Sequence, residues 1–306
     1  MTIIRARILG FCMGVRRAVE LATVQAQKAA EEGFQLYTLG HLIHNPQVSA
    51  DLEKRGVITL KQNYFEQIRD KGENHRVIIR AHGISPETEE TLRDTGCAII
   101  DATCPNVKKN QLKTRELSRA CYGLFLAGES AHAEIEGIIG YASSAPFCET
   151  VVNARQARDA AAALYQTNSN VKTALIGQTT ISEEEYRNIG DEIKKYFPNL
   201  EIVNTICSAT AERQQALREL LIDADAIIIA GGKESANTRR LLLIAQESGK
   251  PCAMVEQVGE IPENFYGFKT IGISAGASTP DSLIDEIEKN LAEAQRRRGA
   301  KSLFVG

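Results

Sequence analysis

The chain has 306 residues, of which 43% are hydrophobic and 25% are charged, and this composition is typical of globular chains. Its length corresponds to about two domains, although a single large α/β unit of this size also occurs. The 36 basic and 39 acidic residues give a formal net charge of −3, which argues against a broad nucleic-acid surface and against a polybasic membrane anchor.

The longest apolar stretches have only strand length, and the N-terminal sequence MTIIRARILGFC lacks an apolar segment followed by a cleavage site. We therefore expect a cytoplasmic protein without a membrane segment. In such a protein the seven cysteines predict metal ligands, reactive thiols or buried thiols rather than disulfides. No Cys-X-X-Cys pair occurs, which excludes zinc ribbons, thioredoxin-type motifs and ferredoxin-type cluster motifs.

Short β-branched apolar runs alternate with longer amphipathic segments along the chain. This pattern predicts an α/β protein in which helices cover both faces of parallel sheets. The predicted strands are 3–9, 36–39, 77–81, 98–101, 124–127, 173–176, 226–230, 253–256 and 270–274. The predicted helices include 14–31, 105–120, 182–196, 209–222, 237–248 and 280–293. From residue 294 the sequence predicts a surface arm, whose arginine run is a solvated helix end.

One pattern occurs three times: a predicted strand leads into a cysteine that begins a helix. The sequences are ILGFCMGVRRA at Cys12, IIDATCPNVKK at Cys104 and IVNTICSATAERQ at Cys207. Loops that follow parallel strands gather at the carboxyl edge of a sheet, where α/β proteins place their sites. Three similar units around an axis would bring the three thiols together. A helix N-terminus also lowers the pKa of a cysteine, so we expect thiolates.

Three thiolates suit zinc, copper(I) or an iron–sulfur cluster, and the alternative is three buried thiols without a ligand. Zinc would need a fourth protein ligand or a water molecule. A four-iron cluster with three cysteine ligands leaves one iron open to substrate as a Lewis acid. The remaining cysteines lack this setting and are expected to be ordinary thiols: Cys97, Cys121, Cys148 and Cys252.

Several hydrogen-bond donors lie at the same strand ends. His82 and His132 each follow a predicted strand, and His44 lies in the sequence HLIHNP. Imidazoles donate well to phosphate oxygens, and so do neutral side chains and backbone amides where a glycine-rich turn begins a helix. The neutral candidates are Gln178, Thr179, Thr180, Ser235, Asn237, Ser274 and Ser278. The alternative for any single histidine is an ordinary surface or hydrogen-bonded residue.

Three other motifs are excluded. The sequence GGKES lacks a P-loop pattern, because Ile227 and Glu234 stand where that motif needs a glycine and a hydroxyl residue. The glycines of GFCMG do not have the spacing of the dinucleotide fingerprint. A zinc site formed by His41 and His44 lacks an acidic base between them.

Glu134 is the candidate proton donor, because it stands two residues after His132 at the same strand end. A carboxyl beside a partly desolvated anionic cluster should have a raised pKa and could deliver a proton near neutral pH. The alternative is a solvated glutamate in the first turn of a helix. Glu136 points to another helix face and fits that alternative better.

Nine motifs occur in a fixed order over about residues 3–290: GFCMGVRRA, HNPQV, AHGIS, DATCP, HAEIEG, QTT, NTICSATAERQ, SANTRR and AGASTPD. In order and spacing they resemble the LytB/IspH family of 4-hydroxy-3-methylbut-2-enyl diphosphate reductases. The resemblance implies cluster ligands at Cys12, Cys104 and Cys207 and diphosphate donors at His44, His82 and His132. It implies Glu134 as proton donor with Thr179 as relay, and further substrate contacts at Ser235, Ala236, Asn237 and Ser278. Ala236 and Ala133 depart from the serine and proline that members often carry.

The resemblance also implies a cloverleaf of three α/β units with pseudo-threefold arrangement around a central cluster. The expected units are 14–101, 102–204, and 1–13 plus 205–282, followed by a C-terminal helix and arm over 283–306. The implied cofactor is one 4Fe–4S cluster with an open fourth iron, which can be lost to give a 3Fe–4S form.

The implied reaction is the two-electron reductive dehydroxylation that yields isopentenyl and dimethylallyl diphosphate, the last step of the methylerythritol phosphate pathway. The implied electron donor is a ferredoxin or flavodoxin, with no nucleic-acid or membrane partner. Two alternatives are an iron–sulfur hydro-lyase, which needs no reductant, and a non-catalytic iron–sulfur sensor.

Overall fold

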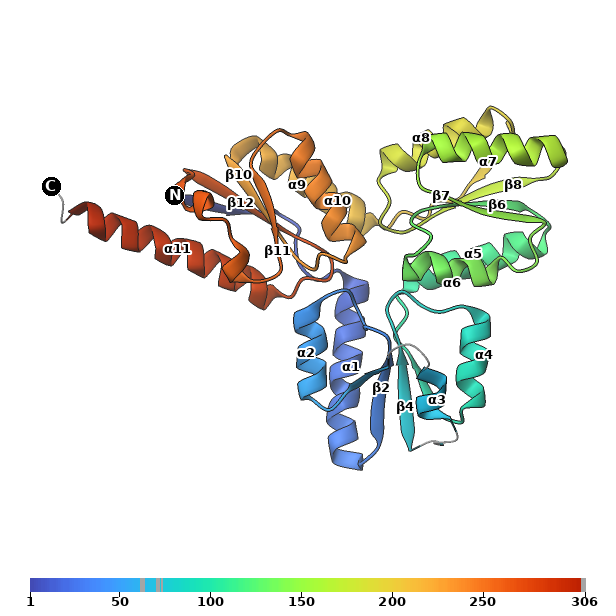
Figure 1. The fold of residues 1–306 in the computed structure, drawn as a ribbon, viewed down its shortest axis with the longest axis horizontal. Helices are drawn as coiled ribbons and strands as arrows, with labels where there is room; N and C mark the ends of the chain where they lie inside the picture. Colours follow the sequence, from blue (N-terminus) through green and yellow to red (C-terminus); the bar gives the residue numbers. More distant parts are fainter. Residues whose placement is uncertain (61–63, 70–71, 73, 304–306) are drawn as a thin grey trace. The chain divides into compact units, whose positions relative to one another are not determined.

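A computed structural model describes residues 1–60, 64–69, 72 and 74–303. The chain packs into two compact units. Unit 1 consists of Met1–Val15, His44–Val48 and the segment from Ser208, and unit 2 consists of Arg16–Ile43 and Ser49–Cys207. The described residues form three four-stranded sheets with only parallel pairing (Figure 1). This confirms the predicted α/β class with three similar parallel sheets.

The first sheet of unit 2 has the strand order β3-β2-β4-β5. Its strands are β2 (Gln35–Leu39), β3 (Ile58–Leu60), β4 (His75–Ile79) and β5 (Ala98–Asp101), and the accompanying helices are α1 (Met13–Glu32), α2 (Pro46–Lys54), α3 (Tyr64–Ile68) and α4 (Pro86–Asp94). Apolar side chains of β2 and β4, such as Leu39 and Val77, pack against Ile68 of α3 and Leu92 of α4.

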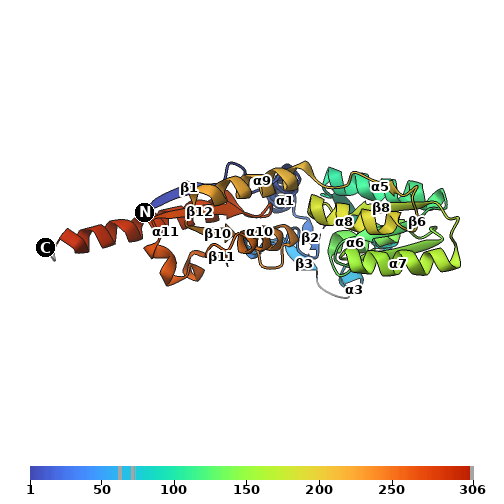
Figure 2. The same ribbon diagram turned by 90° about the horizontal axis from the view of Figure 1, so that it is seen from above.

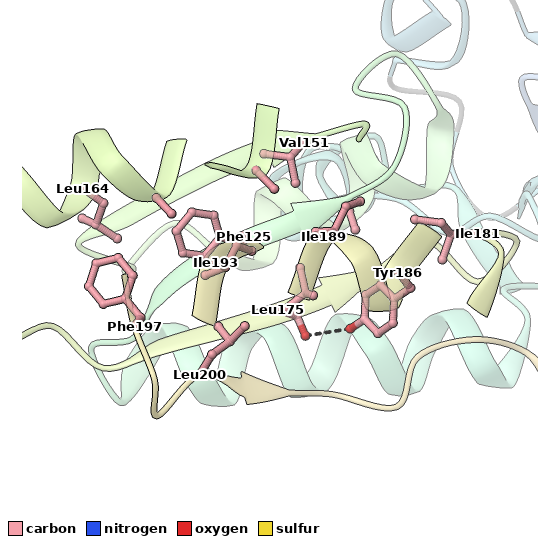
Figure 3. Close-up of a cluster of buried hydrophobic side chains, with 13 residues drawn as sticks. Phe125, Val151, Leu164, Leu175, Ile181, Tyr186, Ile189, Ile193, Phe197 and Leu200 are labelled. Carbon is pink, nitrogen blue, oxygen red and sulfur yellow. Dashed lines mark hydrogen bonds between the residues drawn. The ribbon is translucent and has the colours of Figure 1, made fainter. Parts of the chain in front are cut away.

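The second sheet of unit 2 has the order β7-β6-β8-β9. Its strands are β6 (Gly123–Ala127), β7 (Phe147–Val151), β8 (Thr173–Gly177) and β9 (Glu201–Ile202), and its helices are α5 (Pro105–Arg119), α6 (Ala133–Tyr141), α7 (Ala154–Thr167) and α8 (Glu183–Lys194). Successive strand residues point to opposite faces. Phe125 and Leu175 therefore pack with α7 and α8 (Figure 3), whereas Leu124 and Ile176 pack with α5 and α6.

The sheet of unit 1 has the order β1-β12-β10-β11. Its strands are β1 (Thr2–Arg5), β10 (Ala226–Ala230), β11 (Cys252–Val255) and β12 (Thr270–Ala275), and its helices are α9 (Ser208–Asp223), α10 (Ala236–Glu247), α11 (Asp281–Leu303), η1 (Val258–Glu260) and η2 (Glu263–Gly267). Figure 2 shows β1 beside β12, its parallel partner. Ile228 of β10 packs toward α11, and Ile227 and Ile229 pack toward α9 and α10.

All three sheets share one order of strands. When the strands of one sheet are numbered in chain order, the second strand lies beside the first, the first beside the third and the third beside the fourth, as in β7-β6-β8-β9. In unit 1 the fourth position is taken by β1, from the start of the chain. The residue boundaries of the three predicted α/β units stay a prediction.

All nine predicted strands occur. The bounds of β5 and β10 are as predicted and the other seven have shifted ends; β1 stops at Arg5, where its pairing with β12 ends. The predicted list lacked β3, β7 and β9, which all lie at sheet edges where half-exposed residues blur the apolar pattern. It also lacked α2, α3, α4, α6 and α7. Helix α11 continues to Leu303 where an arm was predicted, and residues 304–306 of that arm lie outside the described residues. Within the described part of the chain, none of the helices combines the length and the hydropathy that a membrane crossing requires.

Ile189→Ala tests the packing of α8 on β6 and β8. Ile189 is completely buried among Phe125, Leu175 and their neighbours, so the substitution should lower the free energy of unfolding by about 2–5 kcal/mol. The matched control is Ile222→Ala in α9, because Ile222 is 79% exposed and should change stability by less than about 0.5 kcal/mol. Denaturant unfolding measures both, and equal losses would contradict the packing.

Candidate active site

The predicted site residues follow the same strands in each sheet. The first strands of the three sheets are β2, β6 and β10, with β1 counted as the fourth strand of its sheet. His44 follows β2, the pair His132 and Glu134 follows β6, and the segment from Ser235 to Asn237 follows β10. After the third strands β4, β8 and β12 come His82, Thr179 and Ser278. After the fourth-position strands β5, β9 and β1 come Cys104, Cys207 and Cys12. All of them lie at carboxyl ends of parallel strands, where α/β folds form sites.

Each of the three cysteines is fixed by the same backbone hydrogen bond. The Cys104 N–H donates to the Ala81 carbonyl at 2.9 Å, next to His82. The Cys207 N–H donates to the Thr179 carbonyl at 3.1 Å, and the Cys12 N–H donates to that of Ala277, next to Ser278, at 3.1 Å. Each bond ties a cysteine to the loop after the neighbouring third strand, and α5, α9 and α1 begin one residue later.

Polar side chains from helices hold the same loops, and the sequence analysis missed them. Asn110 Nδ2 of α5 donates to the Thr205 carbonyl at 3.3 Å, and Arg213 Nη2 of α9 donates to that of Gly10 at 2.6 Å. Arg17 Nη1 of α1 donates to the Thr103 carbonyl at 3.2 Å. Asn110 and Arg213 are only 3% and 2% exposed, so the available signal was a polar residue on the buried face of an amphipathic helix.

The sulfur atoms of Cys12 and Cys207 accept hydrogen bonds. Cys12 Sγ accepts from the Val15 N–H at 3.4 Å, in unit 1, and Cys207 Sγ accepts from Asn106 Nδ2 at 3.2 Å, in unit 2. Each of these sulfur atoms therefore lies at the start of a helix and within reach of an N–H donor. Such sulfur donors fit an iron–sulfur cluster or zinc, so the chemistry of these residues is compatible with the implied cofactor.

In unit 2 the carboxyl group of Glu134 is buried and bonded to Thr179. The Thr179 N–H donates to Glu134 Oε1 at 2.9 Å and its Oγ1 donates to Oε2 at 2.8 Å. Because the Thr179 carbonyl accepts from the Cys207 N–H, one residue links this carboxyl to a cysteine loop. Glu134 is 1% exposed, so the alternative of a solvated glutamate is wrong. Glu136 is exposed, as expected, and its carboxylate lies 3.6 Å from Arg80.

Burial raises the pKa of Glu134 to about 7, although the two hydrogen bonds from Thr179 act in the opposite direction. The expected raised pKa therefore arises within unit 2 from desolvation by the protein itself. A carboxyl group with this pKa is about half protonated at neutral pH, as a proton donor requires.

Two imidazole rings lie near Glu134. His132 caps α6, and its Nδ1 accepts from the Glu134 N–H at 3.2 Å, which leaves the proton of the neutral ring on Nε2. The His82 ring meets the His132 ring edge to face, with centroids 5.3 Å apart. Unit 2 therefore brings together His82, His132, Glu134 and Thr179. These residues follow the carboxyl ends of strands in its two sheets, as do Cys104 and Cys207.

Unit 1 brings together the other predicted contacts. Ser278 Oγ donates to the His44 carbonyl at 3.2 Å, and a Cβ on Gly232 would lie 2.5 Å from that oxygen, so glycine is required there. Ser235 caps α10 through the Thr238 N–H, and Ala236 is the first residue of the helix. Asn237 is 4% exposed, and neither polar atom of its side chain has a partner among the described residues, which points to a ligand.

The other four cysteines do not begin helices. Cys97 Sγ donates to the Ile68 carbonyl at 3.5 Å, and Cys148 lies in β7, where burial raises the pKa of its thiol to about 11. Cys252 lies in β11 and Cys121 follows α5. Burial also raises the pKa of the Cys252 thiol, so Cys148 and Cys252 favour the protonated form.

Thr179→Val should raise the pKa of Glu134 above about 7, because the substitution removes the Oγ1 donor that favours the charged carboxylate. Infrared titration of the carboxyl band measures this pKa, and the difference from Glu134→Gln assigns the band. Thr180→Val is the matched control, because the Thr180 hydroxyl bonds Gln178 instead and the pKa should not move. An ordinary glutamate pKa in the wild-type protein would contradict the burial argument.

The chain is similar to known proteins over nearly its whole length. The family model described as LytB protein matches residues 3–292. A 4-hydroxy-3-methylbut-2-enyl diphosphate reductase of Treponema denticola is 41% identical over 295 residues, covering 96% of this chain and 100% of the relative. A solved (E)-4-hydroxy-3-methyl-but-2-enyl diphosphate reductase, the terminal enzyme of the non-mevalonate pathway, is 37% identical with a TM-score of 0.67, covering 96% and 100%. The E-1-hydroxy-2-methyl-but-2-enyl-4-diphosphate reductase of Plasmodium falciparum is 27% identical with a TM-score of 0.84, covering 95% and 87%. This chain belongs to the LytB protein family.

Proposed function

We propose that this chain is a 4-hydroxy-3-methylbut-2-enyl diphosphate reductase, which removes the hydroxyl group of an allylic alcohol by two-electron reduction. The products are isopentenyl and dimethylallyl diphosphate. The observation that carries the proposal is the pairing of Glu134 with Thr179, because it joins a carboxyl group protonated near neutral pH to the loop of Cys207. The name and the high coverage of the Treponema denticola relative support the same activity.

We assign Cys12, Cys104 and Cys207 as the ligands of one 4Fe–4S cluster whose fourth iron has no protein ligand. When bound, such a cluster supplies electrons singly and offers one Lewis-acidic iron. The hydrogen bonds to Cys12 Sγ and Cys207 Sγ support this assignment, because hydrogen bonds to cysteine sulfurs are a usual feature of protein iron–sulfur sites.

The diphosphate of the substrate would be bound mainly by neutral donors. We assign this role to the imidazoles of His44, His82 and His132 and to the polar groups of Ser235, Asn237 and Ser278. Ala236 has no side-chain donor, but its backbone N–H at the start of α10 suits a phosphate oxygen. The unpaired amide of buried Asn237 and the Nε2 proton of His132 support this role.

Glu134 would donate the proton that converts the departing hydroxyl group into water. Its buried carboxyl retains the proton near neutral pH, and the Thr179 hydroxyl can pass a proton between the carboxyl and the substrate. Diphosphate binding at a distance from the reacting carbon fixes the position of the hydroxyl group, which lowers the entropic cost of the reaction.

The two electrons require a one-electron carrier protein, and we propose a ferredoxin or flavodoxin for this role. We place the reaction in the cytoplasm, since a reducing compartment keeps cysteine ligands available for a cluster. The near balance of 36 basic and 39 acidic residues supports a small-molecule substrate rather than a nucleic acid.

Anaerobic purification, iron and sulfide analysis and a substrate assay test the proposal together. We expect about four irons per chain, by the composition of a cubane cluster, and conversion of substrate only with dithionite or a reduced carrier. Turnover without a reductant would indicate a hydro-lyase instead. A stable cluster without any turnover would indicate a sensor.

Replacement of Cys12, Cys104 or Cys207 by serine should abolish both the brown chromophore and the activity. Serine removes the thiolate with little change in volume, so folding should be retained. Cys148→Ser, in β7, is the matched control and should keep full cluster content. Absorption spectra and iron analysis measure the outcome. Full turnover in one of the three variants would refute that ligand.

Glu134→Gln should keep the cluster and bind substrate, yet lose turnover by about 100- to 10,000-fold, as general acids usually contribute. In the wild-type protein the rate should fall as the pH rises through about 7, because Glu134 then loses the proton that it donates. Glu136→Gln is the control, since Glu136 is exposed. Near-normal turnover of Glu134→Gln would remove this residue as the donor.

A further inference from the structure

The sulfur of Cys207 accepts a hydrogen bond from a side chain of another element. Asn106, the second residue of α5, donates from Nδ2 to Cys207 Sγ at 3.2 Å. Asn106 stands two residues after Cys104, so the helix that follows one proposed ligand bonds the sulfur of a second. We propose that Asn106 is a positioning residue that raises the reduction potential of the cluster through Cys207.

A second amide on the same face of α5 supports the contact. Asn110 lies four residues after Asn106, and positions four apart face the same side of a helix. Its Nδ2 donates to the Thr205 carbonyl, two residues before Cys207, at 3.3 Å. Asn110 is 3% exposed, whereas Asn106 is half-buried. One amide therefore holds the backbone of the Cys207 loop, and the other reaches its sulfur.

In sequence, the position of Asn106, two residues after Cys104, has no amide counterpart after Cys12 or Cys207. The residues two places after Cys12 and Cys207 are Gly14 and Ala209, and neither has a side-chain donor. Cys12 Sγ instead accepts from the Val15 N–H, a local contact of its own helix start. The bond from Asn106 spans 101 residues of sequence and couples two cysteine loops of unit 2.

The effect on the potential follows from charge. A hydrogen bond to a thiolate ligand draws negative charge from the metal centre, and reduction adds one further negative charge to it. The bond is therefore stronger in the reduced state and shifts the equilibrium toward that state. This inference rests on the proposed function, because only a redox-active centre at Cys207 would use such a bond.

The test is a redox titration of the anaerobically purified holoenzyme, followed by absorbance and electron paramagnetic resonance. Asn106→Leu keeps the side-chain size and removes the donor. At a fixed potential the ratio of reduced to oxidised cluster should fall about tenfold, which corresponds to about 59 mV for a one-electron couple. Asn106→Asp, which places a negative charge beside the sulfur, should lower the ratio further. Asn168→Leu is the matched control, because Asn168 is exposed after α7 and the ratio should not change.

The iron–sulfur stretching frequencies in resonance Raman spectra should shift in Asn106→Leu and stay unchanged in the control. If Asn106→Leu loses its cluster, Asn106→Asp decides the question by the same titration. A wild-type potential in a loaded Asn106 variant overturns the inference alone. Wild-type protein that binds no cluster overturns the proposed function together with the inference.

Discussion

The candidate site depends on one hydrogen bond that recurs in each sheet, from a cysteine N–H to the carbonyl of the loop after the third strand. The acceptors are Ala81, Thr179 and Ala277. The bond requires the fourth-position strand to lie beside the third, and the common strand order provides this neighbour. It fixes the turn from strand to helix, so each thiol stands at the N-terminus of a helix.

Thiolates and a neutral carboxyl group need opposite surroundings, and unit 2 provides both near one loop. The sulfur of Cys207 lies at a helix start and accepts from Asn106, which favours negative charge. The carboxyl of Glu134 is buried, which disfavours negative charge and raises its pKa. Thr179 is bonded to both residues: its carbonyl accepts from the Cys207 N–H, and its hydroxyl donates to the Glu134 carboxyl. It therefore fixes the position of the carboxyl relative to the cysteine loop.

Most of the scaffold could be predicted from the sequence, because central parallel strands are uninterrupted apolar runs such as β10. Three edge strands, β3, β7 and β9, were missed, whereas the edge strands β1, β5 and β11 were predicted. Strand β9 has only two residues, and its pairing with β8 depends on a neighbour distant in sequence. The cysteine turns and the strand-end histidines were visible because several donors recur in one setting. Asn106, Asn110 and Arg213 were not, since a single polar residue in a helix does not reveal which loop it reaches until that loop is folded against it.

The three sheets repeat one topology, but their equivalent loops carry different chemistry. The loops after the third strands supply His82, Thr179 and Ser278, and those after the first strands supply His44, His132 with Glu134, and Ser235. The buried acid Glu134 belongs to the second sheet, and α5 supplies the side-chain donor Asn106 to the sulfur of Cys207. An unsymmetrical substrate, with a diphosphate at one end and a hydroxyl group at the other, requires such differences. A repeated scaffold can place ligands in equivalent turns, whereas the side chains that differ between the turns decide where the proton is delivered and where the anion is bound.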